Sequence, residues 1–348
     1  MGQVARSLLA AAAGAVVARI GLRAAREHAA GDAARGTFLD EQRWNRVNHR
    51  GEPVTLLEGP AYAAAASAAV LAAPGLSGRM RAAGVLAAAG AGAFGVYDDL
   101  YGNADRRGIK GHLTALTQGE VTTGGVKIVG IGAVGVVGGC LARRGGGMLE
   151  KALAGVVVAG AANAVNLLDL RPGRAIKGAA LVAAPGMLTR AVRGESAGAR
   201  SRVSGGRARG TDLSMAQSAN TMAAAGLGAA LALLPEDLGE RSMLGDAGAN
   251  AMGALLGLAA AAGARSTAGL AWRAAALTGV TLASEKVSFT KVIAGNPTLN
   301  AIDMWGRRPA AAVPRLPAQA SVDGSVGAGV ESSADGEGTA ASEPDPRG

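Results

Sequence analysis

The chain has 348 residues, of which 49% are hydrophobic, only 3% are aromatic and 18% are charged, and its formal net charge is +9. Its single cysteine excludes both a disulfide framework and a thiolate metal site. The positive charge does not indicate nucleic-acid binding, because Lys and Arg lie between apolar blocks and lack interleaved aromatic residues. Membrane orientation and contact with anionic lipid explain it better.

The hydrophobic residues form long blocks, several of which reach the ~20 residues that a helix needs to cross a bilayer core. A soluble Ala-rich helical bundle is the alternative. In chain order, the sequence predicts helices at 4–22, 54–73, 80–97, 124–142, 149–167, 176–192, 216–234, 246–264 and 270–287. We therefore expect an all-α fold, a polytopic transmembrane bundle of about nine to ten helices that occupies residues 1–308.

Three segments lie outside this pattern of internal helices. The first block is long for a signal peptide and lacks a persuasive cleavage site, so we expect a retained helix. Residues 190–212 are basic and rich in Gly and Ser, which predicts a flexible loop. Residues 309–348 are dominated by Pro, Ala, Gly, Ser and acidic residues, which predicts a disordered tail.

Polar motifs recur where alternate helices reach the same membrane face. Because successive spans alternate in direction, the predicted helices three, five, seven and nine end on one side. The junctions there carry VYDDLYGNAD (96–105), NAVNLLDLRPGR (163–174), LGDAGAN (244–250) and ASEKVSFTK (283–291). We expect these motifs to converge at the cytoplasmic face of a cell (inner or plasma) membrane, although the basic run after Arg190 lies on the other face.

Asp98, Asp99 and Asp246 are the candidate metal and catalytic carboxylates. Asp98 and Asp99 end an apolar helix, where their mutual repulsion and burial require a compensating cation such as Mg²⁺. A solvated acidic loop start is the alternative. Asp246 opens the eighth predicted helix, where it would either cap that helix or coordinate a metal that accompanies a phosphate.

Candidate substrate-binding residues follow the fifth predicted helix. Asn163, Asn166 and Asp169 recur at every third position, which places them along one side of the helix end and suits hydrogen bonds to a base or sugar. Hydrogen bonding between helices is the alternative. Arg171, Arg174 and Lys177 would form a phosphate-binding edge or simply anchor the helix at the membrane surface.

Lys110, His112 and Lys127 lie in or beside the long loop after the paired aspartates. Of the three, His112, in the sequence KGHL, is the most suggestive. A solvated loop histidine is the alternative.

The order of these motifs resembles the polyprenyl-phosphate N-acetylhexosamine-1-phosphate transferase superfamily (glycosyltransferase family 4 type), which includes phospho-N-acetylmuramoyl-pentapeptide transferase. The resemblance covers about residues 48–308. VYDDLYG is similar to the family's paired-aspartate motif, and NAVNLLDL to the start of its Asn-Ala-x-Asn-Leu-x-Asp-Gly-Leu-Asp-Gly motif. LGDAGAN is similar to its Gly-Asp-x-Gly-Ser motif.

The resemblance implies a Mg²⁺-dependent transfer of sugar-1-phosphate from a UDP-sugar to a polyprenyl phosphate, in cell-wall or surface-glycan synthesis. It implies that Asp98 and Asp99 are catalytic and that Asp246 and Asp99 bind Mg²⁺. The residues expected to contact substrate are Asn163, Asn166, Asp169, Arg171, Arg174, Lys177 and His112. The lipid bilayer and the two substrates are the expected partners, nucleic acid is not one, and a homodimer is one alternative for the oligomeric state.

The chain also departs from the family pattern. Pro172 replaces the second aspartate of the Asn-rich motif, Met243 stands where the peptidoglycan enzyme has an aromatic residue, and the family's His-rich loop is missing. A catalytically degenerate homologue that binds a lipid phosphate or acts as a scaffold is therefore the main alternative. A membrane aromatic prenyltransferase is disfavoured because a second Asp-rich loop is absent, and a CDP-alcohol phosphotransferase because its Asp-Gly and Ala-Arg pattern is absent.

Overall fold

The computed structural model describes residues 2–31, 35–48, 50–102, 111, 114–115, 117–143, 145–204 and 210–309, with backbone only for 193–204 and 210–214. Met1–Arg308 forms one compact unit, separate from Pro309–Gly348. The predicted tail, apart from Pro309, lies outside the described residues, as does His112.

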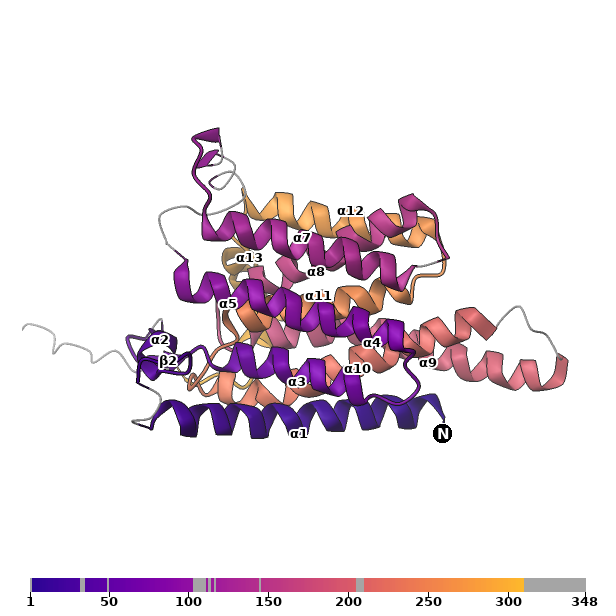
Figure 1. Cartoon of the computed structure of the whole chain (residues 1–348), viewed down its shortest axis with the longest axis horizontal. Helices are drawn as coiled ribbons and strands as arrows, with labels where there is room; N and C mark the ends of the chain where they lie inside the picture. Colours follow the sequence, from indigo (N-terminus) through magenta and orange to yellow (C-terminus); the bar gives the residue numbers. More distant parts are fainter. Residues whose placement is uncertain are drawn as a thin grey trace, which may run out of the picture. The chain divides into compact units, whose positions relative to one another are not determined.

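The first unit is almost entirely helical (Figure 1). Its long helices are α1 (Gln3–Ala29), α3 (Glu58–Ala72), α4 (Gly78–Val85), α5 (Ala91–Tyr101), α7 (Thr123–Ala142), α8 (Met148–Leu168), α9 (Arg174–Ser204), α10 (Gly210–Leu238), α11 (Gly245–Ala262) and α12 (Thr267–Ser284). A π-helical turn, η2 (Leu86–Gly90), joins α4 to α5. Shorter elements are α2 (Glu41–Trp44), α13 (Phe289–Gly295), α14 (Pro297–Met304), β1 (Asn45–Val47) and β2 (Pro53–Thr55).

Every segment predicted as a helix overlaps a helix of the structure, so the all-α prediction is confirmed. In the described part of the chain, six helices are long and apolar enough to cross a membrane: α1, the α4–η2–α5 helix, α7, α8, α9 as far as Val192, and α10 from Met215. These are compatible with a multi-pass membrane protein. The predicted count of nine to ten spans is not confirmed, because α3 has 15 residues and α11 and α12 are not apolar enough over their length.

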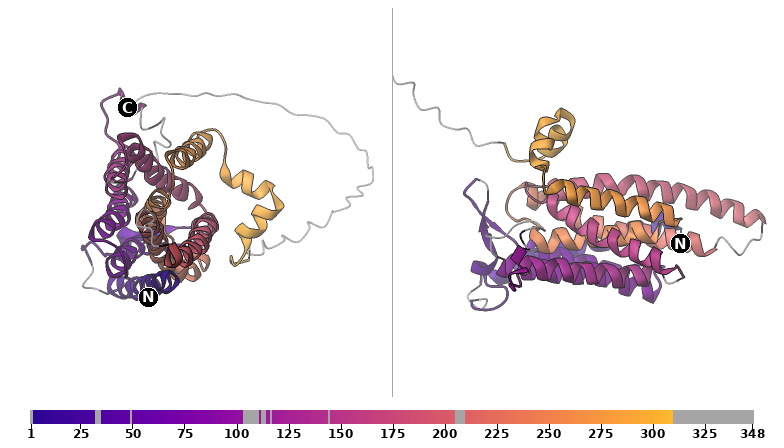
Figure 2. Two further views of the ribbon diagram at one scale, coloured as in Figure 1. Left: turned by 90° about the vertical axis from the view of Figure 1, so that its right-hand side faces the viewer. Right: turned by 90° about the horizontal axis from the view of Figure 1, so that it is seen from above.

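The centre of the bundle is α11, which packs against α3, α5, α8 and α10 (Figure 2, left). Fifteen of its 18 residues are buried. Glycines bring the backbones together: a Cβ at Gly253 would lie 2.3 Å from the Ala161 carbonyl oxygen of α8, and one at Gly59 of α3 would lie 2.2 Å from the Leu244 carbonyl oxygen. Small residues that allow backbones this close are typical of packed membrane helices.

The polar motifs gather at one end of the bundle, on the left in Figure 1, where α5, α8, α10 and α12 end and α11 begins. The antiparallel hairpin β1–β2 lies at this end (Figure 1). It is tied to the α10–α11 loop by the Met243 N–H, which donates to the Thr55 carbonyl oxygen at 3.0 Å. Trp44 is fully buried beneath it, and its Nε1 donates to the Phe38 carbonyl oxygen at 2.7 Å.

The prediction of a loop at 190–212 is wrong over much of that segment. The backbone of α9 continues as a helix to Ser204, and α10 begins at Gly210, while 205–209 lie outside the described residues. The stretch contains Ala, Arg and Glu, which are good helix formers, and these outweigh its Gly and Ser content.

Candidate active site

A lysine joins two of the predicted motifs. Lys127, in the first turns of α7, places its Nζ 2.5 Å from Asp98 Oδ2 and 2.6 Å from Asp246 Oδ2. Asp98 lies at the end of α5 and Asp246 at the start of α11, so three helices contribute to this contact. All three side chains are half-buried. One ammonium group therefore balances two carboxylates, and the group carries a net negative charge.

Asp99 has a different role from its neighbour. Its Oδ1 accepts the backbone N–H of Asp246 at 3.0 Å, and its Oδ2 accepts that of Ala247 at 2.9 Å. The carboxylate thus satisfies two of the free N–H groups at the start of α11 and lies in the favourable field of that helix end. Gly245 has a φ of 57°, and a Cβ there would lie 3.1 Å from both Asp99 oxygens. Glycine at 245 therefore permits the contact.

Asp169 approaches the same helix start from α8. Its carboxylate accepts the backbone N–H of Gly245, while its Oδ2 is buried and has no hydrogen-bond partner among the described residues. Burial raises the pKa of Asp169 well above its usual range, and the nearby Asp237 carboxylate raises it further. Asp98, Asp99, Asp169 and Asp246 therefore surround one place, the N-terminus of α11.

Two further buried carboxylates, Glu58 and Asp237, extend this acidic group. Glu58 Oε1 and Asp237 Oδ2 have no hydrogen-bond partner within the described ranges, although Ser242 donates to the other oxygen of Glu58. Sequence reasoning missed both residues. The only signal was a carboxylate at the start or end of an otherwise apolar helix.

The two asparagines of the Asn-rich motif do not both face the carboxylates. Asn163 Nδ2 donates to Thr281 Oγ1 of α12 at 2.9 Å, which is the interhelical alternative. Asn166 is half-buried, and its side chain makes no hydrogen bond with the described residues. Of the pair, Asn166 is therefore the one with donors and an acceptor left for a ligand.

Two of the three predicted phosphate-binding cations are held by α14. Arg174 donates from Nε and Nη2 to the two carboxylate oxygens of Asp303, at 2.8 and 3.0 Å. Lys177 Nζ donates to the backbone carbonyl oxygens of Asp303 at 2.6 Å and Trp305 at 3.0 Å. Arg307 Nη2 also donates to Asp303, at 2.8 Å. Although burial opposes its ionisation, the hydrogen bonds from Arg174 hold the pKa of Asp303 below its usual range.

Arg171 and Arg46 are two cations at this end that have no acidic partner among the described residues. Arg171 is half-buried, and its side chain makes no hydrogen bond or ion pair within the described part of the chain. The Arg46 guanidinium, on β1, donates only to backbone carbonyl oxygens, those of Arg43, Asn45 and Asp99. Its contact with Asp99 places a positive charge beside the paired aspartates, a feature that the sequence did not reveal.

No known protein-family model matches the chain, and no curated protein matches it. The resemblance therefore rests on the motifs and on where their residues lie.

The residues at this end fit a magnesium ion only in part. Among the described residues, no group of three or more His, Cys, Asp or Glu side chains is arranged to hold a metal. Mg²⁺ is commonly held by one or two protein carboxylates, with water and phosphate oxygens completing its shell. Asp98 and Asp246, which already share one cation, fit such a two-carboxylate site. Asp99, the other predicted ligand, has both oxygens engaged by backbone N–H groups.

Proposed function

We propose that the protein is a membrane transferase that moves a sugar-1-phosphate from a UDP-sugar to a polyprenyl phosphate with Mg²⁺, in cell-wall or surface-glycan synthesis. One observation carries the proposal. Three motifs separated by about 70 to 150 positions in sequence supply Asp98, Asp99, Asp169 and Asp246 to the start of a single helix. Such an accumulation of carboxylates costs stability unless a cationic or phosphate-bound ligand uses it.

In the proposed reaction, an oxygen of the polyprenyl phosphate attacks the phosphorus atom next to the sugar. The bond between the two phosphates of the UDP-sugar breaks, and UMP leaves. Mg²⁺ held by Asp98 and Asp246 would neutralise phosphate charge. Lys127, released from these carboxylates, would donate to a phosphate oxygen, and Arg46 and Arg171 would lie at the rim. Asp99 would hold the start of α11 in place, and Asn166 would donate to the nucleotide or sugar.

The same proposal includes the membrane arrangement. We place the chain in the cell (inner or plasma) membrane with nine to ten spans and the carboxylate end in the cytoplasm. Arg43, Arg46, Arg50, Arg171 and Arg307 lie near this end, in accordance with the positive-inside tendency. UDP-sugars are water-soluble, so a cytoplasmic site would have direct access to them.

The test is UMP release by the purified full-length protein with undecaprenyl phosphate, Mg²⁺ and a panel of UDP-N-acetylhexosamines. We expect release with at least one donor and a loss of at least about 100-fold in Asp246→Asn and Asp98→Asn. Glu150→Gln is the matched control, because Glu150 pairs with Arg143 at the other end of the bundle and should leave activity unchanged. The proposal fails if no donor supports release.

A degenerate homologue that binds a lipid phosphate without catalysis is the second candidate. It is favoured by Pro172 in the Asn-rich motif and by the engagement of Arg174 and Lys177 with Asp303. Binding of undecaprenyl phosphate without UMP release, unchanged by Asp246→Asn, would support this candidate over the enzyme.

A further inference from the structure

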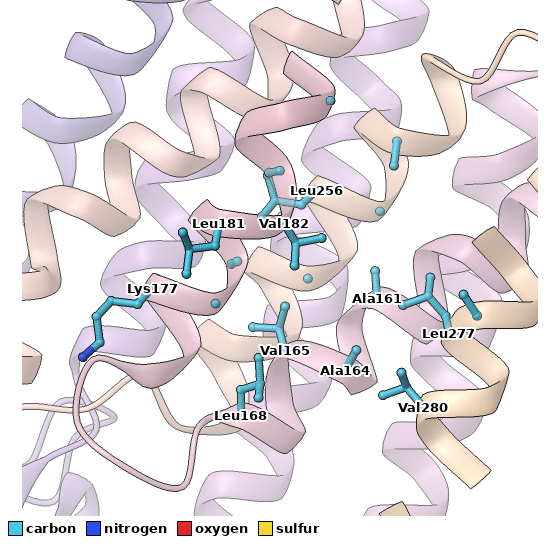
Figure 3. Close-up of a pocket in the computed structure, with 18 of the residues that line it drawn as sticks. Ala161, Ala164, Val165, Leu168, Lys177, Leu181, Val182, Leu256, Leu277 and Val280 are labelled. Atoms are coloured by element: carbon cyan, nitrogen blue, oxygen red, sulfur yellow. The ribbon is translucent and has the colours of Figure 1, made fainter. Parts of the chain in front are cut away.

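An apolar cavity lies along α9, and its lining includes Asp303 but none of the carboxylates at the start of α11. It has a volume of about 780 Å³ and is lined by α8, α9, α11, α12, α13 and α14. Figure 3 shows apolar side chains from four helices around it, among them Val165, Leu181, Leu256 and Leu277, with Lys177 at its edge. Several lining residues are exposed, and Val182 is 82% exposed. The cavity is therefore a groove that opens to the surroundings of the bundle.

The groove has charged groups at two levels. Lys177 and Arg190 both line it and are separated by 13 positions on α9, which corresponds to ~20 Å along a helix. Lys177 lies at the carboxylate end, where its Nζ donates to the backbone carbonyl oxygens of Asp303 and Trp305. Arg190 lies at the other end, together with Arg273 of α12.

Arg190 and Arg273 are two positive charges that have no negative partner among the described side chains. Neither forms an ion pair with a carboxylate among the side chains that the structure describes, and the charge of Arg273 acts unfavourably on Arg190. Arg273 donates only to the Gly269 carbonyl oxygen of its own helix, at 3.0 Å. Two arginines facing one apolar groove with no counter-charge are costly unless an anion joins them.

Arg190 is also held in a fixed position. Its Nε donates to Asn220 Oδ1 at 2.6 Å, and Asn220, which is buried, donates in turn to the Met187 carbonyl oxygen at 2.9 Å. The Cδ of Arg190 would lie 2.9 Å from a Cβ at Gly263, so a glycine at the end of α11 makes room for the arginine. Asn220 engages only Nε, and the two terminal nitrogens make no hydrogen bond with the described residues, so both can bind an anion.

The dimensions point to one kind of ligand. Trp272, adjacent to Arg273, is 74% exposed, and tryptophans at such positions are typical of the membrane–water interface. The level of the arginines thus corresponds to lipid headgroups. The apolar groove beyond that level is ~20 Å long, which exceeds the ~15 Å hydrocarbon thickness of one leaflet, so the groove is long enough for an acyl chain. A guanidinium pair matches a phosphate group.

We propose that Arg190 and Arg273 bind the phosphate of an anionic phospholipid from the leaflet opposite the carboxylate end, with an acyl chain of that lipid lying in the groove. This site is independent of the transferase reaction, because its cations and its bilayer face both differ from those of the carboxylate site. It is distinct from a site for the acceptor lipid, whose phosphate would have to reach Asp98 and Asp246.

Native mass spectrometry of the full-length protein in detergent, with phosphatidylglycerol or phosphatidylcholine added, tests the proposal. We expect the protein to bind phosphatidylglycerol about tenfold more tightly, and Arg190→Gln/Arg273→Gln to lose this preference. Arg190→Lys/Arg273→Lys should keep most of it, which separates loss of charge from misfolding. The matched control Arg79→Gln/Arg265→Gln removes two charges from the same face, outside the groove, and should behave as the unsubstituted protein.

Four outcomes would overturn the proposal. The first is equal binding of the two phospholipids, and the second is an unchanged preference in Arg190→Gln/Arg273→Gln. The other two concern the source of the phosphate. If inorganic phosphate displaces the lipid, the arginines bind a free anion, and if undecaprenyl phosphate displaces it from the Gln variant as readily as from the unsubstituted protein, the groove belongs to the acceptor lipid.

Discussion

Two of the ion-pair clusters at the carboxylate end of the bundle are opposite in charge. In the first, Lys127 alone balances Asp98 and Asp246. In the second, Asp303 alone receives Arg174 and Arg307, and Lys177 donates to its backbone carbonyl oxygen. A carboxylate excess can accept a further cation, whereas a carboxylate fully enclosed by arginines holds two elements together. The first cluster is therefore suited to binding and the second to docking α14.

The largest effect is expected from Asp303→Asn, which breaks the docking cluster. The substitution removes the carboxylate that Arg174 and Arg307 contact, at a site where Asp303 is only 6% exposed. We expect a loss of about 3–5 kcal/mol in the free energy of unfolding, measured by thermal or denaturant unfolding in detergent. The Glu52→Gln variant, which breaks the exposed Arg308–Glu52 pair, should show no measurable change.

The Asp303 effect should depend on pH. Because the pKa of Asp303 is below its usual range in the folded protein, its stabilisation is present above the unfolded value of about 3.9 and is lost as the pH falls through the folded pKa. The difference between the original protein and Asp303→Asn should therefore be constant from pH 8 to pH 5 and shrink below pH 4. A difference that instead grew under acid conditions would contradict the assigned ion pair.

Lys127→Met breaks the binding cluster. Its effect on the free energy of unfolding should be smaller than that of Asp303→Asn and should depend on the metal. Removal of the ammonium leaves Asp98 and Asp246 repelling each other, which we expect to cost about 2 kcal/mol without divalent cations. Millimolar Mg²⁺ should restore much of the lost melting temperature in this variant and change the original protein less. If Mg²⁺ has no larger effect on Lys127→Met, the two carboxylates are not a magnesium site.

Gly245→Ala tests how the binding cluster is supported by α11. A side chain at a φ of 57° is strained, and its Cβ would approach the Asp99 oxygens, so we expect a loss of about 1–2 kcal/mol. The structure offers a control in Gly279→Ala, since nothing lies within 4 Å of the added Cβ and no such strain exists. Equal melting temperatures for the two variants would contradict the contact between Asp99 and the start of α11.

Asn163→Ala measures the stability contributed by an uncharged contact between two helices. Its hydrogen bond to Thr281 joins α8 and α12, and such bonds in membrane bundles average about 0.6 kcal/mol. A double-mutant cycle with Thr281→Ala measures the coupling. If Asn163 contacted substrate instead, UMP release would fall far more than stability, and the cycle would show no coupling.

The positions of the helices were predictable because apolar length is a local property of the sequence. The convergence of Asp98, Asp99, Asp169 and Asp246 was also predictable, since alternation of successive helices assigns each junction to a face. The hairpin, α13 and α14 were not predicted. These short segments lack a periodic apolar pattern. Their conformation depends on contacts with distant parts of the chain, such as that of Arg50 with Glu240.

By itself, the sequence determined the helices and the end of the bundle at which the polar motifs lie. Only the tertiary structure decided which charge each motif residue meets, because the partners are far apart along the chain. Lys127 and Asp246 are 119 positions apart, and Arg174 and Asp303 are 129 apart. Charge attraction depends on distance in space, which a local sequence pattern does not reveal. Asp98 and Asp99 are identical neighbours in sequence, yet they have different partners in the structure.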